Sequence, residues 1–156
     1  MVYSRGHPRD YDDWEAAGAS GWGYASVLPY FIRSENNQDL PASHYHGRGG
    51  PVNVRRPSHP NRLNSDFIAA TQSLGFPRTA DFTGADSEGV GLRQGTIRAG
   101  TRETTARAFL RPALRRGNVT LYTEALALQV IVENNRAAGV AYEREGQRHE
   151  IGRAHV

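Results

Sequence analysis

The sequence predicts a mixed α/β fold that ends in an antiparallel β-meander. Three short runs with strand character, residues 127–133, 137–144 and 147–153, follow one another near the C-terminus. The segments between them, Asn134-Asn135-Arg136 and Glu145-Gly146, are typical of tight hairpin turns, because Asn and Gly tolerate positive φ. Earlier, apolar residues recur at helical spacing over residues 61–74. A meander after single strands and helices is typical of an insert between strands of a larger parallel sheet.

The other elements are expected in chain order. A helix is predicted over residues 10–17, because the Asp residues at its start suit the positive end of a helix dipole. A second helix is predicted over 27–34, with Ser26 as its N-cap and Pro29 in its first turn, where a missing N–H costs little. Strands are predicted over 52–54, 91–97 and 119–123, and a helix over 104–114 whose end Pro112 bends.

The composition allows one ordinary domain with a thin core. The chain has 156 residues, of which 38% are hydrophobic, and it contains no Cys. Disulfides and thiolate metal sites are therefore excluded. No apolar run reaches the roughly 18 residues of a membrane span. The first residues carry no apolar signal region, so a cytoplasmic location is expected.

The charge pattern argues against a nucleic-acid partner. The net charge is only +3, and all 19 basic residues are Arg. They are scattered and mostly interleaved with acidic residues, whereas a surface that follows phosphates needs a clustered basic stripe. We therefore expect the arginines to be solvated residues on the protein surface.

Motifs carry more information than composition. The chain opens with Met1-Val2-Tyr3-Ser4-Arg5-Gly6 and continues with Asp10-Tyr11-Asp12-Asp13-Trp14. Further motifs follow in order: Gly21-Trp22-Gly23-Tyr24, Leu28-Pro29-Tyr30-Phe31, His46-Gly47-Arg48-Gly49-Gly50-Pro51, Asp81-Phe82-Thr83-Gly84, Glu88-Gly89-Val90-Gly91, Gln94-Gly95-Thr96 and Asn118-Val119-Thr120-Leu121. Each motif is weak alone, but the ordered series over nearly the whole chain is specific. It resembles the glucose–methanol–choline (GMC) oxidoreductases, in particular their choline-dehydrogenase-like branch.

The resemblance implies a flavoprotein. Members of that family bind FAD on a doubly wound domain and oxidise an alcohol by hydride transfer to the flavin. It further implies that residues 1–38 lie beside the FAD domain, that 39–118 belong with the substrate-side cap, and that 119–156 give an FAD-domain strand and the meander. The implied substrate is a small alcohol such as choline.

Two parts of such an enzyme are missing from the chain. It contains no G-x-G-x-x-G motif after a strand, and the family's catalytic His would lie beyond Val156. We therefore expect an internal piece of a longer protein, with the remainder of the parent chain as its partner. Alone it should neither retain FAD nor turn over alcohols.

Three residues are implied as cofactor contacts. The backbone of Met1 and Val2 is expected to line the isoalloxazine ring, since in the family these residues follow an Asn that lies against it. Ala127 occupies the position where the family places a Val backbone on the adenine. A change from Val to Ala preserves backbone contacts and weakens side-chain packing.

Other interpretations of the chain remain open. The pair His44 and His46 could chelate a metal, but a zinc site needs three or four convergent ligands, so loop or turn histidines are expected. The aromatic residues between Trp14 and Phe31 are expected to pack in a core. A non-catalytic binding module, or a degenerate remnant of the family, is the alternative function, and it would be a stably folded monomer. The fragment interpretation instead predicts exposed apolar edges on residues 119–123 and on the meander.

Overall fold

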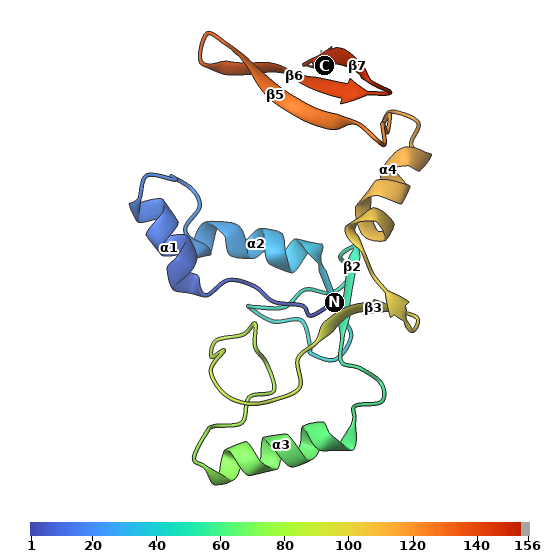
Figure 1. Cartoon of the computed structure of the whole chain (residues 1–156). Coiled ribbons are helices and arrows are strands. Elements are labelled where there is room, and N and C mark those ends of the chain that lie inside the picture. The colour runs from blue at the N-terminus through green and yellow to red at the C-terminus, as the bar shows by residue number, and fades with distance from the viewer. Residues whose placement is uncertain (154–156) are drawn as a thin grey trace. The chain divides into compact units, whose positions relative to one another are not determined.

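The computed structural model describes residues 1–153 and confirms the mixed α/β fold. The elements are α1 (Pro8–Ala16), α2 (Tyr24–Ser34), β1 (Glu35–Asn37), β2 (Val52–Arg55), α3 (Arg62–Ser73), β3 (Gly95–Arg98), β4 (Thr101–Arg102), the π-helical turn η1 (Ala106–Leu110), α4 (Arg111–Arg115), β5 (Leu126–Glu133), β6 (Arg136–Arg144) and β7 (Gln147–Gly152). They divide between two compact units, Met1–Pro112 and a second unit that begins at Ala113. Figure 1 shows the elements along the chain.

The first unit is built on a small mixed sheet in the order β1-β2-β3-β4. β1 pairs with β2 in parallel, while β2–β3 and β3–β4 are antiparallel. β1 follows α2 without a break, so the end of that helix delivers Glu35 and Asn37 directly into the sheet. The sequence pattern did not predict β1 or β4, because strands of three and two residues are too short to show a period.

The second unit contains the predicted meander. β5, β6 and β7 form an antiparallel sheet in that order. Both connections are two-residue turns with positive φ, at Asn134 and Asn135 (50° and 57°) and at Glu145 and Gly146 (54° and 73°). Positive φ at both central residues is the type I′ geometry that matches the twist of paired strands. The hairpin prediction is therefore confirmed.

Several local predictions were wrong. The N-cap of α2 is Gly23 instead of Ser26, so Pro29 lies inside the helix and not in its first turn. Pro29 has no N–H, so the bond that this position would otherwise donate to Ala25 O is missing from α2. No strand forms over residues 119–123 within the described chain. The helix predicted over 104–114 does form, but its first part is a π-helical turn and only Arg111–Arg115 is α-helical.

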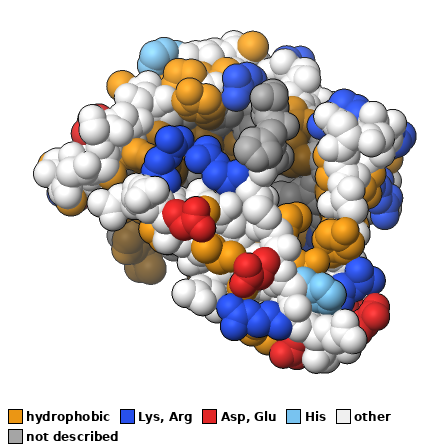
Figure 2. Space-filling model, turned by 90° about the horizontal axis from the view of Figure 1, so that it is seen from above, with side chains coloured by type: hydrophobic (Ala, Val, Ile, Leu, Met, Phe, Trp, Pro, Cys, Tyr) orange, Lys and Arg blue, Asp and Glu red, His pale blue; other side chains and the backbone are white. Residues whose placement is uncertain are grey.

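The apolar core is as thin as the composition predicted. Among the described residues, the buried hydrophobic side chains are Leu28, Val54, Ala108 and Ala141. Many large apolar side chains are exposed, including Phe67 on α3 and Leu126, Val130 and Val132 on β5, as predicted for the meander. Figure 2 shows apolar side chains on the surface of the face that it presents. The aromatic residues Trp14, Trp22 and Tyr30 are also more than half exposed, so the expected aromatic core is only partly formed.

Among residues 1–153, no helix is both long enough and apolar enough to cross a lipid bilayer.

Candidate functional site

The first three residues form a short outer strand against β3. Tyr3 N donates to Gln94 O at 2.8 Å, and Thr96 N donates to Met1 O at 2.8 Å. These two bonds flank the bridge between Val2 and Gly95, which makes it a non-hydrogen-bonded antiparallel pair. In such a pair the N–H and C=O of Val2 point away from β3. They have no backbone partner in the part of the chain that the structure describes.

The outer strand also presents its side chains to the surface. Met1 is 56% exposed and Val2 is 64% exposed. The close approach to β3 depends on Gly95, because a Cβ there would lie 2.9 Å from Met1 O. The result is an edge with free backbone groups and exposed apolar side chains, held by two hydrogen bonds.

A buried carboxylate lies at the centre of this unit. Glu35 is fully buried, and it is one of the largest completely buried side chains among the described residues. Its Oε2 accepts from Arg5 Nη2 at 3.0 Å and from Gly47 N at 2.9 Å. Its Oε1 accepts from Asn37 Nδ2 at 2.9 Å. A buried ion pair is tolerated when its remaining hydrogen-bonding positions are also satisfied, which is the case here.

Arg5 connects this carboxylate to the outer strand. Its guanidinium also donates to Tyr45 O at 2.6 Å, and its Nε lies 3.3 Å from the Tyr3 hydroxyl. Burial raises the pKa of Tyr3 above its ordinary value of 10.0; the Arg5 charge opposes that change and the Glu35 charge adds to it. The pKa of Tyr24 is also raised, chiefly by burial and against the opposing Arg5 charge. Both phenols therefore stay protonated and neutral at physiological pH.

A second set of hydrogen bonds joins Glu35 to the outer strand, through the side-chain amides of Asn37 and Gln94. Asn37 Nδ2 donates to Gln94 Oε1 at 3.0 Å, and Gln94 Nε2 donates back to Asn37 Oδ1 at 3.0 Å. Gln94 Nε2 also donates to Asp39 Oδ2 at 2.8 Å. The backbone carbonyl of Gln94 accepts from Tyr3 N, so this branch ends on the outer strand as well.

His46 extends the cluster in the opposite direction. It is 4% exposed, with Nδ1 3.2 Å from Glu35 Oε2 and Nε2 2.8 Å from Asp81 Oδ2. Burial opposes the charged form of Asp81. The hydrogen bonds from His46 and from Thr83 outweigh that penalty, so the pKa of Asp81 lies below its ordinary value of 3.8. We call the four charged or titratable side chains Arg5, Glu35, His46 and Asp81 the buried relay; the first three are buried, and the Asp81 side chain is 30% exposed.

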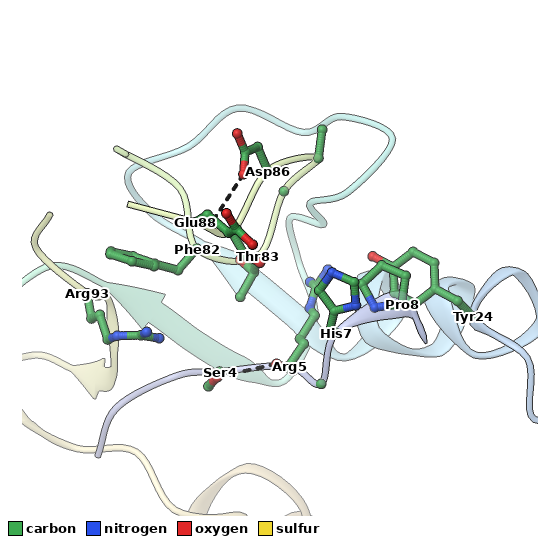
Figure 3. A pocket seen from close by; sticks show the side chains of 14 residues that line it. Ser4, Arg5, His7, Pro8, Tyr24, Phe82, Thr83, Asp86, Glu88 and Arg93 are labelled. Atoms are coloured by element: carbon green, nitrogen blue, oxygen red, sulfur yellow. Dashed lines mark hydrogen bonds between the residues drawn. The ribbon is translucent and has the colours of Figure 1, made fainter. Parts of the chain in front are cut away.

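A pocket lies beside the buried relay. One wall is the segment Ser4–Pro8 with Tyr24, and the other is the loop Phe82–Glu88 with Arg93, around a cavity of about 290 Å³. Figure 3 shows Arg5 and His7 on one side of this space and Thr83, Asp86 and Glu88 on the other. The guanidinium of Arg93 lies over the Phe82 ring, 4.1 Å from its centroid. The pocket is therefore predominantly polar and carries charges of both signs.

The three cofactor contacts that the resemblance implied belong to different units of the chain. Met1 and Val2 lie together on the outer strand of the first unit. Ala127 lies in the second unit, on β5, where it is exposed and pairs with Tyr142 of β6. β5 is an edge strand of the described sheet, so alternate residues present free backbone groups on its outer side.

Sequence reasoning missed the buried relay. His46 was expected to be an ordinary loop or turn histidine, whereas it is buried between two carboxylates. Its partners lie 11 and 35 residues away, so no local spacing could have revealed them. The one signal was the tight His46-Gly47-Arg48-Gly49-Gly50-Pro51 turn, whose glycines allow close backbone approach. A Cβ at Gly47 would lie 1.9 Å from Ile32 O.

Comparison with known proteins decides the family. The family model described as GMC oxidoreductase matches residues 1–156. The chain belongs to the GMC oxidoreductase family. The resemblance drawn from the sequence motifs is thereby confirmed.

Curated relatives of this GMC chain are choline dehydrogenases. It is 46% identical over 147 residues to the oxygen-dependent choline dehydrogenase of Rhizobium etli, covering 94% of the chain and 26% of that protein. It is 44% identical over 149 residues to the mitochondrial choline dehydrogenase of Homo sapiens, covering 96% of the chain and 25% of that protein. The chain thus spans about a quarter of the length of the curated relatives that it matches.

Solved structures of other oxidoreductases share the fold of this GMC chain. Pyridoxine 4-oxidase from Mesorbium loti matches with a TM-score of 0.85 and 33% identity, over 97% of this chain and 30% of that one. An FAD-dependent oxidoreductase from Chaetomium thermophilum matches with a TM-score of 0.85 and 28% identity, over 97% and 29%. FAD is the cofactor of the family, in agreement with the FAD-dependent oxidoreductase among these structures.

Proposed function

We propose that this chain is the part of an FAD-dependent alcohol oxidoreductase that lies against the flavin ring and lines one side of the approach to it. The bound flavin would accept a hydride from the CH–OH carbon of a small alcohol, and choline or a related alcohol is the proposed substrate. The observation that carries the proposal is the outer strand, with its free Val2 backbone groups and exposed side chains at a surface edge.

The outer strand fits a planar cofactor with polar edges. The Val2 N–H and C=O project from the sheet edge, where they could bond to the donors and acceptors of an isoalloxazine ring. Met1 O is already bonded to Thr96 N, so Met1 contributes its position and side chain instead of its carbonyl. Fixed backbone dipoles aimed at a redox ring stabilise developing charge without reorganisation during the reaction.

We propose Ala127 separately as a contact for the adenine end of the cofactor. It is exposed on the edge strand β5, and its methyl group leaves the backbone open to a flat ring. Its contribution would come from the backbone, since a methyl group buries little area. A larger side chain such as Val would add packing to the same contact.

The identity to choline dehydrogenases supports the proposed substrate. A quaternary ammonium binds to aromatic faces and carboxylates. The pocket beside the buried relay carries both kinds of group, in the Tyr24 ring and in the carboxylates of Asp86 and Glu88, while the Phe82 ring already has the Arg93 guanidinium over it. These side chains could place a cationic alcohol near the outer strand, although the remainder of the substrate site would have to come from other parts of the protein.

A chimeric enzyme tests the proposal. The aligned part of this chain would replace the matching segment of the Rhizobium etli enzyme, to which the chain is 46% identical over 147 residues. We expect the chimera to purify with bound flavin and to oxidise choline. The control is a chimera of the same length in which the second unit of the chain precedes the first. A correctly folded chimera without flavin absorption would overturn the proposal, and one with flavin but no choline oxidation would overturn its substrate.

A further inference from the structure

We infer that His46 is a positioning residue that fixes the outer strand Met1–Tyr3 relative to the loop Phe82–Glu88. This inference rests on the proposed function, since it assigns a role in holding the flavin-facing strand and the pocket beside it. The imidazole does not reach the surface edge where the cofactor is proposed, so its effect is transmitted through Glu35 and Asp81.

His46 is the most direct link between two groups of contacts. A longer path also joins them, from Gln94 through Asp39 and Arg56 to the backbone carbonyl of Ala80. On the Nδ1 side, Glu35 holds Arg5 directly at 3.0 Å. On the Nε2 side, Asp81 holds the loop, because its Oδ1 accepts from both the N–H and the hydroxyl of Thr83, at 2.9 Å and 3.2 Å. Removal of the imidazole would therefore leave each half intact and take away the shortest link between them.

The two halves are the two walls of the pocket. Arg5 belongs to the Ser4–Pro8 wall, and Thr83 belongs to the Phe82–Glu88 wall (Figure 3). The path from Arg5 through Glu35, His46 and Asp81 to Thr83 consists of contacts between 2.8 and 3.2 Å, if the nearer carboxylate oxygen is taken at each step. A chain of short contacts, of which only the Asp81 end is partly exposed, fixes a separation because each link has a preferred length and direction.

The interior of this unit contains few apolar side chains that could hold the two walls together. Glu35 and Asn37 are among the largest fully buried side chains of the described residues, and the buried hydrophobic residues of this unit are only Leu28, Val54 and Ala108. An unpartnered buried carboxylate is costly, so the network favours a single arrangement in which every partner is in place. That property suits a strand whose backbone must meet a ligand at a fixed position.

Amide hydrogen exchange on the 156-residue chain tests the inference without any flavin. The variants are His46→Gln, which can reach only one of the two carboxylates, and Asp81→Ala, which removes the partner at the loop. We expect roughly tenfold faster exchange at Tyr3 and Thr96, and over residues 82–88, as a charge-assisted hydrogen bond is lost. Asp81→Asn, which can still accept from Nε2, should restore most of the protection.

The matched control is Val54→Ala, which shortens a fully buried side chain of β2 outside the relay. It should lower the melting temperature and raise the amide exchange rate throughout the first unit. The increase should be no larger in residues 1–5 and 82–88 than elsewhere. The inference is overturned if His46→Gln gives the same uniform pattern as Val54→Ala, or if it leaves both segments unchanged.

The chimeric enzyme separates this inference from the proposed function. If the unmodified chimera binds no flavin while His46→Gln still loosens both segments, the proposed function fails and the positioning role stands. If the chimera binds flavin, His46→Gln should alter the flavin absorption spectrum and raise KM for choline, and it should do so more than Val54→Ala does at an equal loss of melting temperature. A flavin spectrum unaffected by His46→Gln would remove the link between the relay and the cofactor.

Discussion

His46 Nε2 lies 2.8 Å from Asp81 Oδ2, and the two residues are 35 positions apart in the chain. This contact ties the turn that follows β1 to the loop that precedes β3. On the other side of the same imidazole lies Glu35, the fully buried carboxylate of the first unit. The first unit is therefore organised around a polar centre with only a thin apolar layer.

The lowered pKa of Asp81 predicts a pH-dependent stability. A carboxyl group whose pKa is lower in the fold than in the unfolded chain stabilises the fold above its unfolded pKa, near 3.8, and loses that contribution as the pH falls through the folded value. The wild-type chain should therefore lose more stability between pH 6 and pH 3 than Asp81→Asn does. Urea unfolding at both pH values measures this.

The control for that experiment is Asp86→Asn, in the same loop. Asp86 is exposed, and its carboxylate accepts only from Glu88 N among the described residues. Its removal should leave the pH dependence of the free energy of unfolding as it is in the wild type. Equal losses for the wild type and Asp81→Asn would contradict the assignment of Asp81 to the buried relay.

Gly47→Ala should destabilise the first unit. A Cβ at this position would lie 1.9 Å from Ile32 O and 2.8 Å from Ile32 C, and backbone atoms cannot rotate away as a side chain could. We expect a loss of about 1–3 kcal/mol in the free energy of unfolding, the usual cost of overpacking. Thermal denaturation followed by circular dichroism measures it. Gly152→Ala is the control, since the nearest atom to its added Cβ is 4.0 Å away, and a similar loss there would show that the close approach at Gly47 is not the cause.

Glu145→Asn should stabilise the second hairpin. Glu145 has φ of 54°, a conformation that costs most side chains free energy and that Asn tolerates better. We expect a gain of about 0.5 kcal/mol, and the ion pair with Arg144 at 3.6 Å is too exposed to offset it. Chemical denaturation measures the change. Glu150→Asn makes the same substitution inside β7, where no gain should occur, and a gain at both positions would rule out relief of the turn as the reason.

The sequence predicted those parts of the fold whose causes are local. Asn134, Asn135 and Gly146 favour positive φ, so both hairpins and the meander could be predicted from a few adjacent residues. The first helix forms as expected but begins two residues earlier, at Pro8, so Asp10 lies within its first turn and accepts from His7 N at 2.8 Å. α3 also lies where the pattern predicted it, although its apolar face is exposed, with Leu63 at 70% and Phe67 at 67%.

The sequence could not predict features that depend on contacts between distant residues. Glu35 is paired with Arg5, 30 positions away, and Asn37 is bonded to Gln94, 57 positions away. No periodic pattern marks such pairs, and a charged residue is ordinarily expected at the surface. The strand expected over residues 119–123 failed for the converse reason. Its composition favours a strand, but no neighbouring strand pairs with it among the described residues.

The central claim is that the outer strand meets the flavin through the Val2 backbone, and a pair of proline variants in the chimeric enzyme tests it most directly. Val2→Pro removes an N–H that points away from β3, a position where proline is tolerated on an edge strand. Tyr3→Pro instead removes the N–H that bonds to Gln94 O and should disrupt the strand itself.

The measurement is the flavin content of each purified variant, read from the ratio of visible to ultraviolet absorbance. We predict that Val2→Pro keeps the melting temperature of the unmodified protein after flavin is removed, yet binds much less flavin. Full flavin content and an unchanged flavin spectrum in a well-folded Val2→Pro protein would contradict the claim.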